Sequence, residues 1–490
     1  MRGHLRGAAA GVLAAGLGIA VAELFAAAAR PGAGPLVAVG GAVIDATPTA
    51  VKEFAVRELG TNDKPVLLGA VGLVLAGLAA LTGVLGLHRR ALVAAGAAVL
   101  GLAGAAAALS RPAGTLPDAI PSLLAATIAG ATLWWLLHSR PTTTPAPSGD
   151  RRAFLRGAAL VAGAAVLAEG GALVVRRTIG RARTDLRLPA PASAAKPSSP
   201  GLATPTGDFY RVDTALTVPR IDPGTWSLRV HGLVDRELRL SLDDLLRRPL
   251  IERDITLNCV SNEVGGPYIG TARWLGVPLG PLLREAGLRD GADQIVARSA
   301  EGMTIGTPVA TALDGRDTML AVAMNGSPLP PEHGFPVRML TPGLYGYAGA
   351  CKWVSELELT TFAAFDAYWV KRGWARAGTV RTASRIDKPR PFARLAAGPV
   401  TVAGVAWAQR RGISKVEVSV DGGPWRRAEL LPVPSVDTWV QWRYSWPATA
   451  GPHSLAVRAT DGDGAVQTED RATPFPSGAT GWHTITVTVS

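Results

Sequence analysis

Residues 253–266 read RDITLNCVSNEVGG, a short apolar strand pattern that runs into a polar, glycine-rich loop. Cys259 lies at this junction and is one of two cysteines in 490 residues, the other being Cys351. Three roles are open for it: an inert buried thiol, half of a disulfide, or a metal ligand. The loop favours an exposed thiolate among backbone N–H donors, which suits a soft or redox-active metal. One cysteine cannot hold a structural zinc or an iron–sulfur cluster, so such a metal would need an organic cofactor for its other ligands.

The composition divides the chain, which is long enough for two or three domains. Residues 1–177 are rich in Ala, Leu, Gly and Val, whereas the remainder has mixed charge and most of the tryptophans. The net charge is +12 at pH 7. The arginines are scattered, and no basic stripe alternates with aromatic residues, which argues against nucleic acid as a partner.

Five segments are long and apolar enough to span a bilayer, which needs about 20 residues. They lie at about 8–29, 66–87, 91–109, 119–137 and 157–175. Basic residues precede the first segment and separate the second from the third and the fourth from the fifth. By the positive-inside rule these places are cytoplasmic, which puts everything after residue 177 outside. The sequence thus predicts an all-α transmembrane bundle over 1–177 in a multi-pass cell-membrane protein, with an amphipathic helix at 48–59 in an outer loop.

Two features connect this part to the rest of the chain. Residues 150–156, DRRAFLR, precede the fifth segment and resemble a twin-arginine export signal, with ordinary basic flanking as the alternative. Twin-arginine export carries proteins already folded, usually around a cofactor, so the motif indicates a cofactor downstream. Residues 178–206 are rich in Pro, Ala and Ser and predict a semi-flexible linker with little to bury.

The remainder predicts two domains. Over 207–390 we expect an α+β domain with strands at 226–234 and 253–260 and helices at 240–249 and 278–288. No GxGxxG, Walker, HExxH or CxxC motif occurs, so local motifs do not identify the chemistry. Over 395–490, alternating apolar residues and Asp-Gly turns predict an Ig-like β-sandwich of about seven strands.

Three segments resemble the sulfite oxidase family of molybdopterin-dependent oxidoreductases. They are DFYRVDTALTVP (208–219), TLNCVSNEVGG (256–266) and MNGSPLPPEHGFPVRMLTPGLYGYAGACKW (324–353). The third is long and specific, and the resemblance covers about 207–490. It implies a molybdopterin-binding domain over 207–390. It also implies a dimerisation-type Ig-like domain over 395–490, and hence a homodimer.

The resemblance also assigns residues to a molybdenum–molybdopterin cofactor. Cys259 would be the protein ligand of molybdenum and, with Arg211, catalytic. The positions around the cofactor are Phe209, Tyr210, Arg211, His333, Arg338, Ala350, Cys351 and Lys352. Of these, His333 and Arg338 would grip the pterin and its phosphate, and Lys352 would complete the phosphate grip. Arginine forks and a lysine charge suit that phosphate.

The sequence departs from the family where sulfite would bind. Sulfite oxidases carry a basic run after the cysteine, where this chain has Asn262-Glu263-Val264. The family's arginine–histidine pair before the KW dipeptide is replaced by Ala348-Gly349-Ala350-Cys351, and Trp374 stands at a tyrosine position. Arg211 remains. Sulfite oxidation and the reduction of a sulfoxide or other oxo-compound are therefore equally open.

The resulting expectation is a membrane-tethered molybdenum oxidoreductase that transfers an oxygen atom to or from a small substrate outside the cytoplasm. No haem-binding or iron–sulfur pattern is evident in the chain, so the electron-transfer partner is expected to be a separate cytochrome or a quinone-linked protein. The alternative is a non-catalytic envelope binding or assembly module with a molybdopterin fold. The presence of Cys259, His333, Arg338 and Lys352 argues against that alternative.

Overall fold

The computed structural model describes residues 2–29, 32–59, 62–111, 114–138, 147–181 and 186–490. The chain forms two compact units, each described by itself below. The helical unit is Met1–Ala182 together with Thr214–Arg220, and the sheet unit is Arg183–Asp213 together with Ile221–Ser490.

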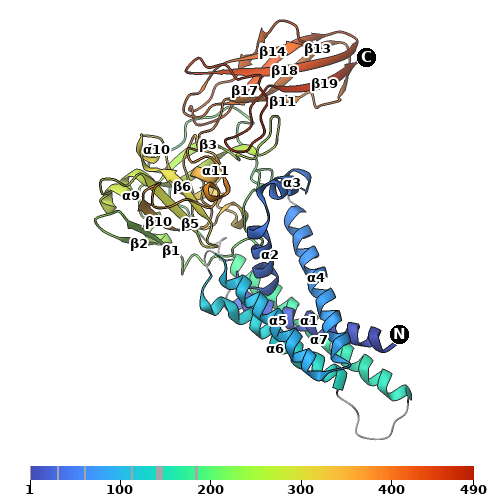
Figure 1. Ribbon diagram of the computed structural model, residues 1–490. Coiled ribbons are helices and arrows are strands. Elements are labelled where there is room, and N and C mark those ends of the chain that lie inside the picture. Colours follow the sequence, from blue (N-terminus) through green and yellow to red (C-terminus); the bar gives the residue numbers. More distant parts are fainter. Residues whose placement is uncertain (1, 30–31, 60–61, 112–113, 139–146, 182–185) are drawn as a thin grey trace. The chain divides into compact units, whose positions relative to one another are not determined.

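Helices make up the first of these units (Figure 1). They are α1 Arg2–Ala29, α2 Pro35–Ala46, α3 Thr49–Leu59, α4 Asp63–Gly86, α5 Arg90–Leu109, the 3-10 turn η2 Leu116–Ala119, α6 Ile120–His138 and α7 Pro147–Arg181. Five helical stretches within the described residues are long and apolar enough to cross a membrane: Gly3–Ala29, Asp63–Gly86, Arg90–Leu109, Leu116–His138 and Arg152–Val175. They coincide with the five segments predicted from the sequence, and α3 matches the predicted amphipathic helix.

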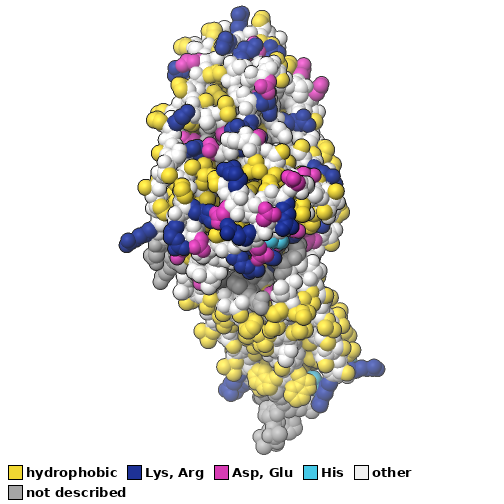
Figure 2. All heavy atoms as spheres, turned by 90° about the vertical axis from the view of Figure 1, so that its left-hand side faces the viewer, with side chains coloured by type: hydrophobic (Ala, Val, Ile, Leu, Met, Phe, Trp, Pro, Cys, Tyr) yellow, Lys and Arg dark blue, Asp and Glu magenta, His cyan; other side chains and the backbone are white. Residues whose placement is uncertain are grey.

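Small residues bring these helices together. α1 packs against α4, α6 and α7, and α5 packs against α6. A Cβ on Gly11 would overlap the backbone carbonyl of Ala79, and one on Gly18 would overlap that of Ala125. Such close backbone approach is how helices associate where no hydrophobic difference separates protein from lipid. On the face drawn in Figure 2, hydrophobic side chains predominate on this unit, whereas charged side chains are spread over the other.

The sheet unit begins with a mixed α+β region. Its elements are β1 Ser227–Gly232, β2 Leu238–Ser241, α8 Leu242–Leu246, β3 Ile251–Asn258, β4 Ile269–Pro278, α9 Leu279–Ala286, β5 Gln294–Ser299, β6 Thr304–Pro308, α10 Val309–Leu313, β7 Met319–Met324, β8 Ser327–Pro328, η3 Pro331–His333, β9 Arg338–Leu340, α11 Gly346–Gly349, β10 Val354–Thr360 and η4 Val370–Arg372. One sheet has the order β2-β1-β10-β5-β6, and the other has β3-β4-β7-β8 with β9 on β7. Ser241 caps α8, its hydroxyl accepting from the Asp244 amide at 3.2 Å.

The last part of the chain is all β. Its strands are β11 Ala383–Lys388, β12 Arg394–Leu395, β13 Gly398–Trp407, β14 Ile413–Val420, β15 Arg426–Arg427, β16 Glu429–Leu430, β17 Val440–Ala448, β18 Gly451–Asp461 and β19 His483–Val489. They form two sheets, β11-β13-β17-β16 and β12-β19-β18-β14-β15. Val402 and Trp442 from one sheet and Val418, Leu455 and Val487 from the other share one buried core, so the two sheets pack face to face as the alternating pattern predicts.

Two sequence expectations fail in this description. The linker over 178–206 is not a free tether: residues 182–185 lie outside the described set, but from 186 on the chain packs on the sheet unit. The Ala192 amide donates to Leu250 O at 2.8 Å, and Leu202 is 1% exposed. In addition, α2 lies where only an outer loop was expected. Its 12 residues are too short to span a bilayer.

Candidate functional site

Strand β3 delivers Cys259 to one end of its sheet. β3 and β4 are antiparallel and pair as far as Asn258 and Ile269. The Cys259 amide then donates to Tyr268 O at 2.9 Å, and the Asn262 amide donates back to Cys259 O at 3.1 Å. The buried Asn262 side chain closes the loop by accepting from the Tyr268 amide at 2.8 Å. The thiol is therefore held at the mouth of a loop whose backbone bonds are internally satisfied.

The thiol itself differs from the sequence expectation. Cys259 is half-buried rather than exposed, and it is free, as is Cys351, so the disulfide alternative is excluded. Burial raises the pKa of the Cys259 thiol, against hydrogen bonds from Ser261 and the charge of Lys352. The loop alone thus keeps the thiol protonated, and a bound metal ion would be needed to hold the thiolate.

Cys351 is a core residue by its side chain. It is 1% exposed and lies in the same apolar cluster as Val337 and Met339. Burial raises the pKa of its thiol, and its carbonyl accepts from the Met339 amide at 2.9 Å. Ala350, just before it, packs against a second apolar cluster that contains Phe209.

Arg338 is the most informative side chain of the site. It lies on β9, is 4% exposed, and sits over the Trp274 ring with its guanidinium carbon 5.0 Å from the ring centroid. Its Nη1 donates to His333 O at 3.1 Å, but its Nε has no partner. Burial lowers the pKa of this guanidinium to about 10. No carboxylate of the described chain pairs with it, and a buried guanidinium without a counter-charge calls for an anion.

Lys352 adds a second cation next to it. Its Nζ donates to Asp213 Oδ2 at 2.8 Å and to Glu332 O at 3.2 Å. Arg211 donates from Nε to the same Asp213 oxygen at 3.1 Å, with its side chain 34% exposed. One buried carboxylate therefore ties two cations together and leaves part of the Arg211 fork open to solvent.

His333 is neutral and lies within the electrostatic influence of both Arg338 and Lys352. Its Nε2 lies 3.3 Å from Thr206 O, and because a carbonyl only accepts, that nitrogen carries the proton. Burial, and then the charges of Arg338 and Lys352, lower the pKa of His333 to about 4. Gly334 follows at φ +109°, and a Cβ there would lie 3.2 Å from the Lys352 Cα, so only glycine lets the two segments meet without strain.

Aromatic rings connect the cysteine to the cations. Phe209 stacks on Tyr210 at 5.2 Å between centroids and meets His333 edge-on at 5.6 Å. Tyr210 lies 6.5 Å from Tyr268 in the Cys259 loop. Burial and then the nearby Cys259 raise the pKa of the Tyr210 hydroxyl, whereas Arg338 opposes the rise. Tyr210 thus lies within electrostatic reach of both the thiol and the buried guanidinium.

The structure brings most of the predicted site residues into this one region. It also adds residues that the sequence did not single out: Thr206, Asp213, Tyr268 and Trp274. Asp213 carried a usable signal, because it lies two residues after Arg211 in the segment that resembles the family. Trp274 carried none, since only β3–β4 pairing places its ring under Arg338.

The residues fit a molybdopterin cofactor. Within the described part of the chain, no group of three or more His, Cys, Asp or Glu side chains could hold a metal ion, so a metal at Cys259 would take its remaining ligands from a bound molecule. The orphaned Nε of Arg338, beside Lys352 and neutral His333, suits an anionic group such as a pterin phosphate. Fold and site together therefore define a molybdopterin-binding oxidoreductase.

Comparison with known proteins leads to the same class. Residues 215–369 match the family described as "Oxidoreductase molybdopterin binding domain". "Uncharacterized oxidoreductase YuiH" of Bacillus subtilis is 32% identical over 157 residues, which cover 32% of this chain and 76% of that protein. Human "Sulfite oxidase, mitochondrial" is 32% identical over 342 residues, 59% of this chain and 62% of that one. The chain belongs to the sulfite oxidase family of molybdopterin-dependent oxidoreductases.

The chain spans only part of several relatives. It covers 50% of mouse sulfite oxidase at 34% identity and 36% of rice "Nitrate reductase [NADH] 1" at 30% identity. Among solved structures, the sulfane dehydrogenase SoxCD from Paracoccus pantotrophus is 26% identical, with a TM-score of 0.49 over 55% of this chain and 75% of that one.

Proposed function

We propose that this protein is a membrane-tethered molybdenum–molybdopterin oxidoreductase that transfers an oxygen atom to or from a small substrate outside the cytoplasm. The observation that carries the proposal is Arg338, a buried guanidinium with an unused N–H and no carboxylate partner in the described chain. It lies in the same region as the one half-buried cysteine. The relatives named sulfite oxidase and nitrate reductase support redox chemistry on small oxo-compounds.

Each residue has a distinct task in this proposal. Cys259 would hold the metal, while Arg338 and Lys352 would hold the anionic end of the pterin, with neutral His333 beside them. When bound, the cofactor supplies two-electron oxygen-atom chemistry. The chain supplies position: the Cys259–Asn262 turn fixes the thiol, and the Phe209–Tyr210 stack gives the cofactor a rigid aromatic wall.

We propose that the substrate pocket is less cationic than that of a sulfite oxidase. The side chain of Arg211 is partly exposed, and its Nε is paired with Asp213 Oδ2. Glu263, in the cysteine loop, is exposed. Tyr347, Trp369 and Trp374 form an aromatic cluster, with ring centroids 5.9 and 6.3 Å from Trp374. Both sulfite oxidation and reduction of a sulfoxide or other oxo-compound remain candidates, with a separate electron-transfer partner.

The membrane tether and the export route belong to the same proposal. The five helices are compatible with spanning a bilayer. The backbone of the twin-arginine-like motif lies in α7, although the side chain of Arg151 is outside the described set.

We also propose that the C-terminal β-sandwich is Ig-like and forms a homodimer. Phe392, 83% exposed next to β12, supports such a contact. Sedimentation of a Phe392→Ser variant as a monomer is the expected result, and an unchanged dimer would count against this interface.

The enzyme proposal is tested on full-length protein from cells with molybdopterin synthesis intact. Molybdenum is measured per chain, and turnover is screened with sulfite, sulfoxides and other oxo-compounds with an artificial electron donor or acceptor. We expect Cys259→Ser to lose turnover by at least about a thousandfold, and Cys351→Ala, at a core thiol, to keep it. Absence of stoichiometric molybdenum in the unmutated protein would overturn the enzyme proposal in favour of a non-catalytic module.

A further inference from the structure

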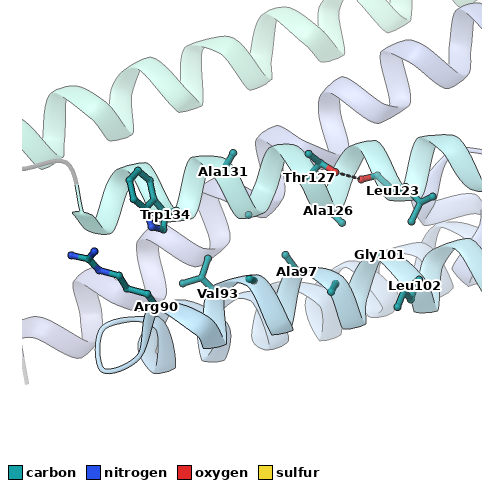
Figure 3. Close-up of a pocket in the computed structure, with 13 residues that line it drawn as sticks. Arg90, Val93, Ala97, Gly101, Leu102, Leu123, Ala126, Thr127, Ala131 and Trp134 are labelled. Atoms are coloured by element: carbon teal, nitrogen blue, oxygen red, sulfur yellow. Dashed lines mark hydrogen bonds between the residues drawn. The ribbon is translucent and has the colours of Figure 1, made fainter.

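A groove runs along the surface of the helical unit between α5 and α6. Its volume is about 550 Å³, and its lining comes from these two helices alone. Figure 3 shows Arg90 and Trp134 together at one end, with Leu102 and Leu123 at the other.

Small residues form the floor of this groove. A Cβ on Gly101 would lie 2.5 Å from the Ala126 Cβ, and one on Gly130 would lie 3.1 Å from the Ala97 Cβ. The helices therefore approach to backbone contact. The side chains at the rim project past the floor, with Leu102 63%, Leu123 42% and Trp134 50% exposed. The groove therefore reaches down to the helix backbones and is open along one side.

The middle of the groove offers nothing to a polar ligand. Its one hydroxyl, on Thr127, donates to Leu123 O of its own helix at 2.8 Å. The remaining lining between the two ends is Ala, Gly and Val. A flexible hydrocarbon chain fits this surface, whereas a quinone ring placed midway would leave its carbonyl groups without donors.

One end of the groove is cationic. Arg90 makes no ion pair within the described part of the chain, and it is the first residue of the 20-residue helix α5. Arg89, at the N-cap, provides no side-chain cap, so the first amides of α5 add their partial positive charge to the guanidinium. The Trp134 indole beside Arg90 is the kind of side chain that settles at a membrane interface.

The length of the groove matches one leaflet. Arg90 and Leu102 are twelve residues apart on one helix, which is about 18 Å at 1.5 Å per residue. Half of a bilayer core of about 30 Å is about 15 Å. A chain lying in the groove with its polar end at Arg90 would thus reach roughly the middle of the bilayer.

We propose that this groove is a binding site for one phospholipid with an anionic headgroup, its phosphate at Arg90 and Trp134 and an acyl chain between α5 and α6. The site rests on the membrane location proposed above. Its lipid would come from the leaflet on the Arg90 side, which the positive-inside rule assigns to the cytoplasm, where anionic lipids also favour basic residues.

The test is native mass spectrometry of the full chain extracted in mild detergent and titrated with phosphatidylglycerol or phosphatidylcholine. We expect one retained phosphatidylglycerol, with at least tenfold preference over phosphatidylcholine. Arg90→Gln should abolish the preference, and the neighbouring Arg89→Gln, which lies outside the groove, should keep it. Ala98→Phe should fill the groove and lose the lipid. Ala95→Phe, on an exposed part of the same helix away from the groove, should retain it.

Three results would overturn this site. The first is equal binding of phosphatidylglycerol and phosphatidylcholine. The second is an equal effect of Arg90→Gln and Arg89→Gln on the lipid preference. The third is one prenylquinone bound per chain that Ala98→Phe displaces and the arginine variants do not. None of these readouts involves turnover or molybdenum. Membrane fractionation of the same preparations separately reports whether the chain is membrane-bound, so failure of the lipid site is distinguishable from failure of the tether.

Discussion

At the scale of single residues, a substitution of Arg338 is expected to weaken cofactor binding while leaving the stability of the fold nearly unchanged. It is buried and has no carboxylate partner in the described chain. In the cofactor-free protein its charge is therefore uncompensated, and replacing such a charge with an apolar side chain of similar size costs little stability. We predict that Arg338→Met lowers molybdenum per chain at least tenfold. The free energy of unfolding of the cofactor-free protein should fall by no more than about 1 kcal/mol.

Arg273→Met is the matched control for that prediction. Arg273 makes two 2.9 Å hydrogen bonds to Asp254, whose side chain is 2% exposed. Its removal would strand a buried carboxylate and cost on the order of 2 kcal/mol, while the folded fraction keeps its molybdenum. Metal analysis and denaturant unfolding measure both quantities. A large loss of stability in Arg338→Met with full metal content would reverse the roles assigned to the two arginines.

A second residue-scale prediction concerns pH. His483 on β19 accepts the Ile386 amide at Nδ1 at 3.0 Å, which requires an unprotonated nitrogen. Burial and then the charge of Arg385 lower the pKa of His483 to about 4. A histidine whose folded pKa lies below its unfolded value of about 6.5 contributes stability in full above that pH, and the contribution is lost as pH falls toward 4.

Between pH 7 and pH 5 this loss should be roughly 1–2 kcal/mol. We predict that His483→Gln shows a shallower fall in the free energy of unfolding over that range than the unmutated protein. His333, with a pKa also near 4, contributes equally to both proteins and cancels in the comparison. Tryptophan fluorescence follows the transition. Parallel pH curves for the two proteins would show that His483 titrates normally in the fold.

At the scale of elements, the C-terminal sheets hold the cysteine loop in place. Arg385 on β11 donates from Nη1 to Gly266 O at 2.7 Å, and a Cβ on Gly265 would overlap the His483 ring. The β3 strand is held from the same side, with Gln409 donating to Thr256 O at 3.1 Å. The β-sandwich is thus a support for the strand and loop that carry Cys259.

Gly265→Ala tests this support. Gly265 has φ +79°, and a Cβ there would overlap the His483 ring. Gly291 has φ +87° with nothing within 4 Å of the same position, so Gly291→Ala reports the backbone strain alone. We predict that Gly265→Ala lowers the free energy of unfolding by at least about 1 kcal/mol more than Gly291→Ala and also lowers molybdenum content.

Removing the ring in Gly265→Ala/His483→Ala should recover the additional loss. Denaturant unfolding measures each step of this series. Equal losses in the two glycine variants would show that the loop does not depend on the sandwich.

How far the sequence predicts these elements depends on whether the signal is local. The five long helices and the long strands of the sandwich follow from hydrophobic period and length, and they occur where expected. The prediction of a flexible linker was wrong for residues 186–206. Pro/Ala/Ser composition carries no information about backbone hydrogen bonds to residues distant in sequence, such as that from Ala192 to Leu250. The predicted solvent exposure of Cys259 was wrong for the same reason, because other segments of the sheet unit bury part of its side chain. The resemblance supplied the site residues, but the missing partner of Arg338 is visible only in three dimensions.

At the scale of the whole molecule, five spans are an odd number and would place the two ends of the helical unit on opposite sides of the membrane. Basic residues flank the ends that the positive-inside rule assigns to the cytoplasm. On that topology the sheet unit would lie outside, and we propose that its cofactor is inserted inside, before export. A route that carries folded protein meets both requirements, and the DRRAFLR motif at 150–156 would supply its signal.

We therefore predict that Arg151→Lys/Arg152→Lys leaves the sheet unit inside the cell, with molybdenum still bound. Protease added to intact spheroplasts should cut the sheet unit of the unmutated protein and spare that of the variant. Arg89→Lys/Arg90→Lys is the matched control, because it changes a neighbouring basic pair on the same side while keeping every charge. Immunoblotting and metal analysis of the protected fraction give the readout. Unchanged cleavage in the Arg151/Arg152 variant would mean that the pair is ordinary basic flanking and that the sheet unit crosses the membrane by another route.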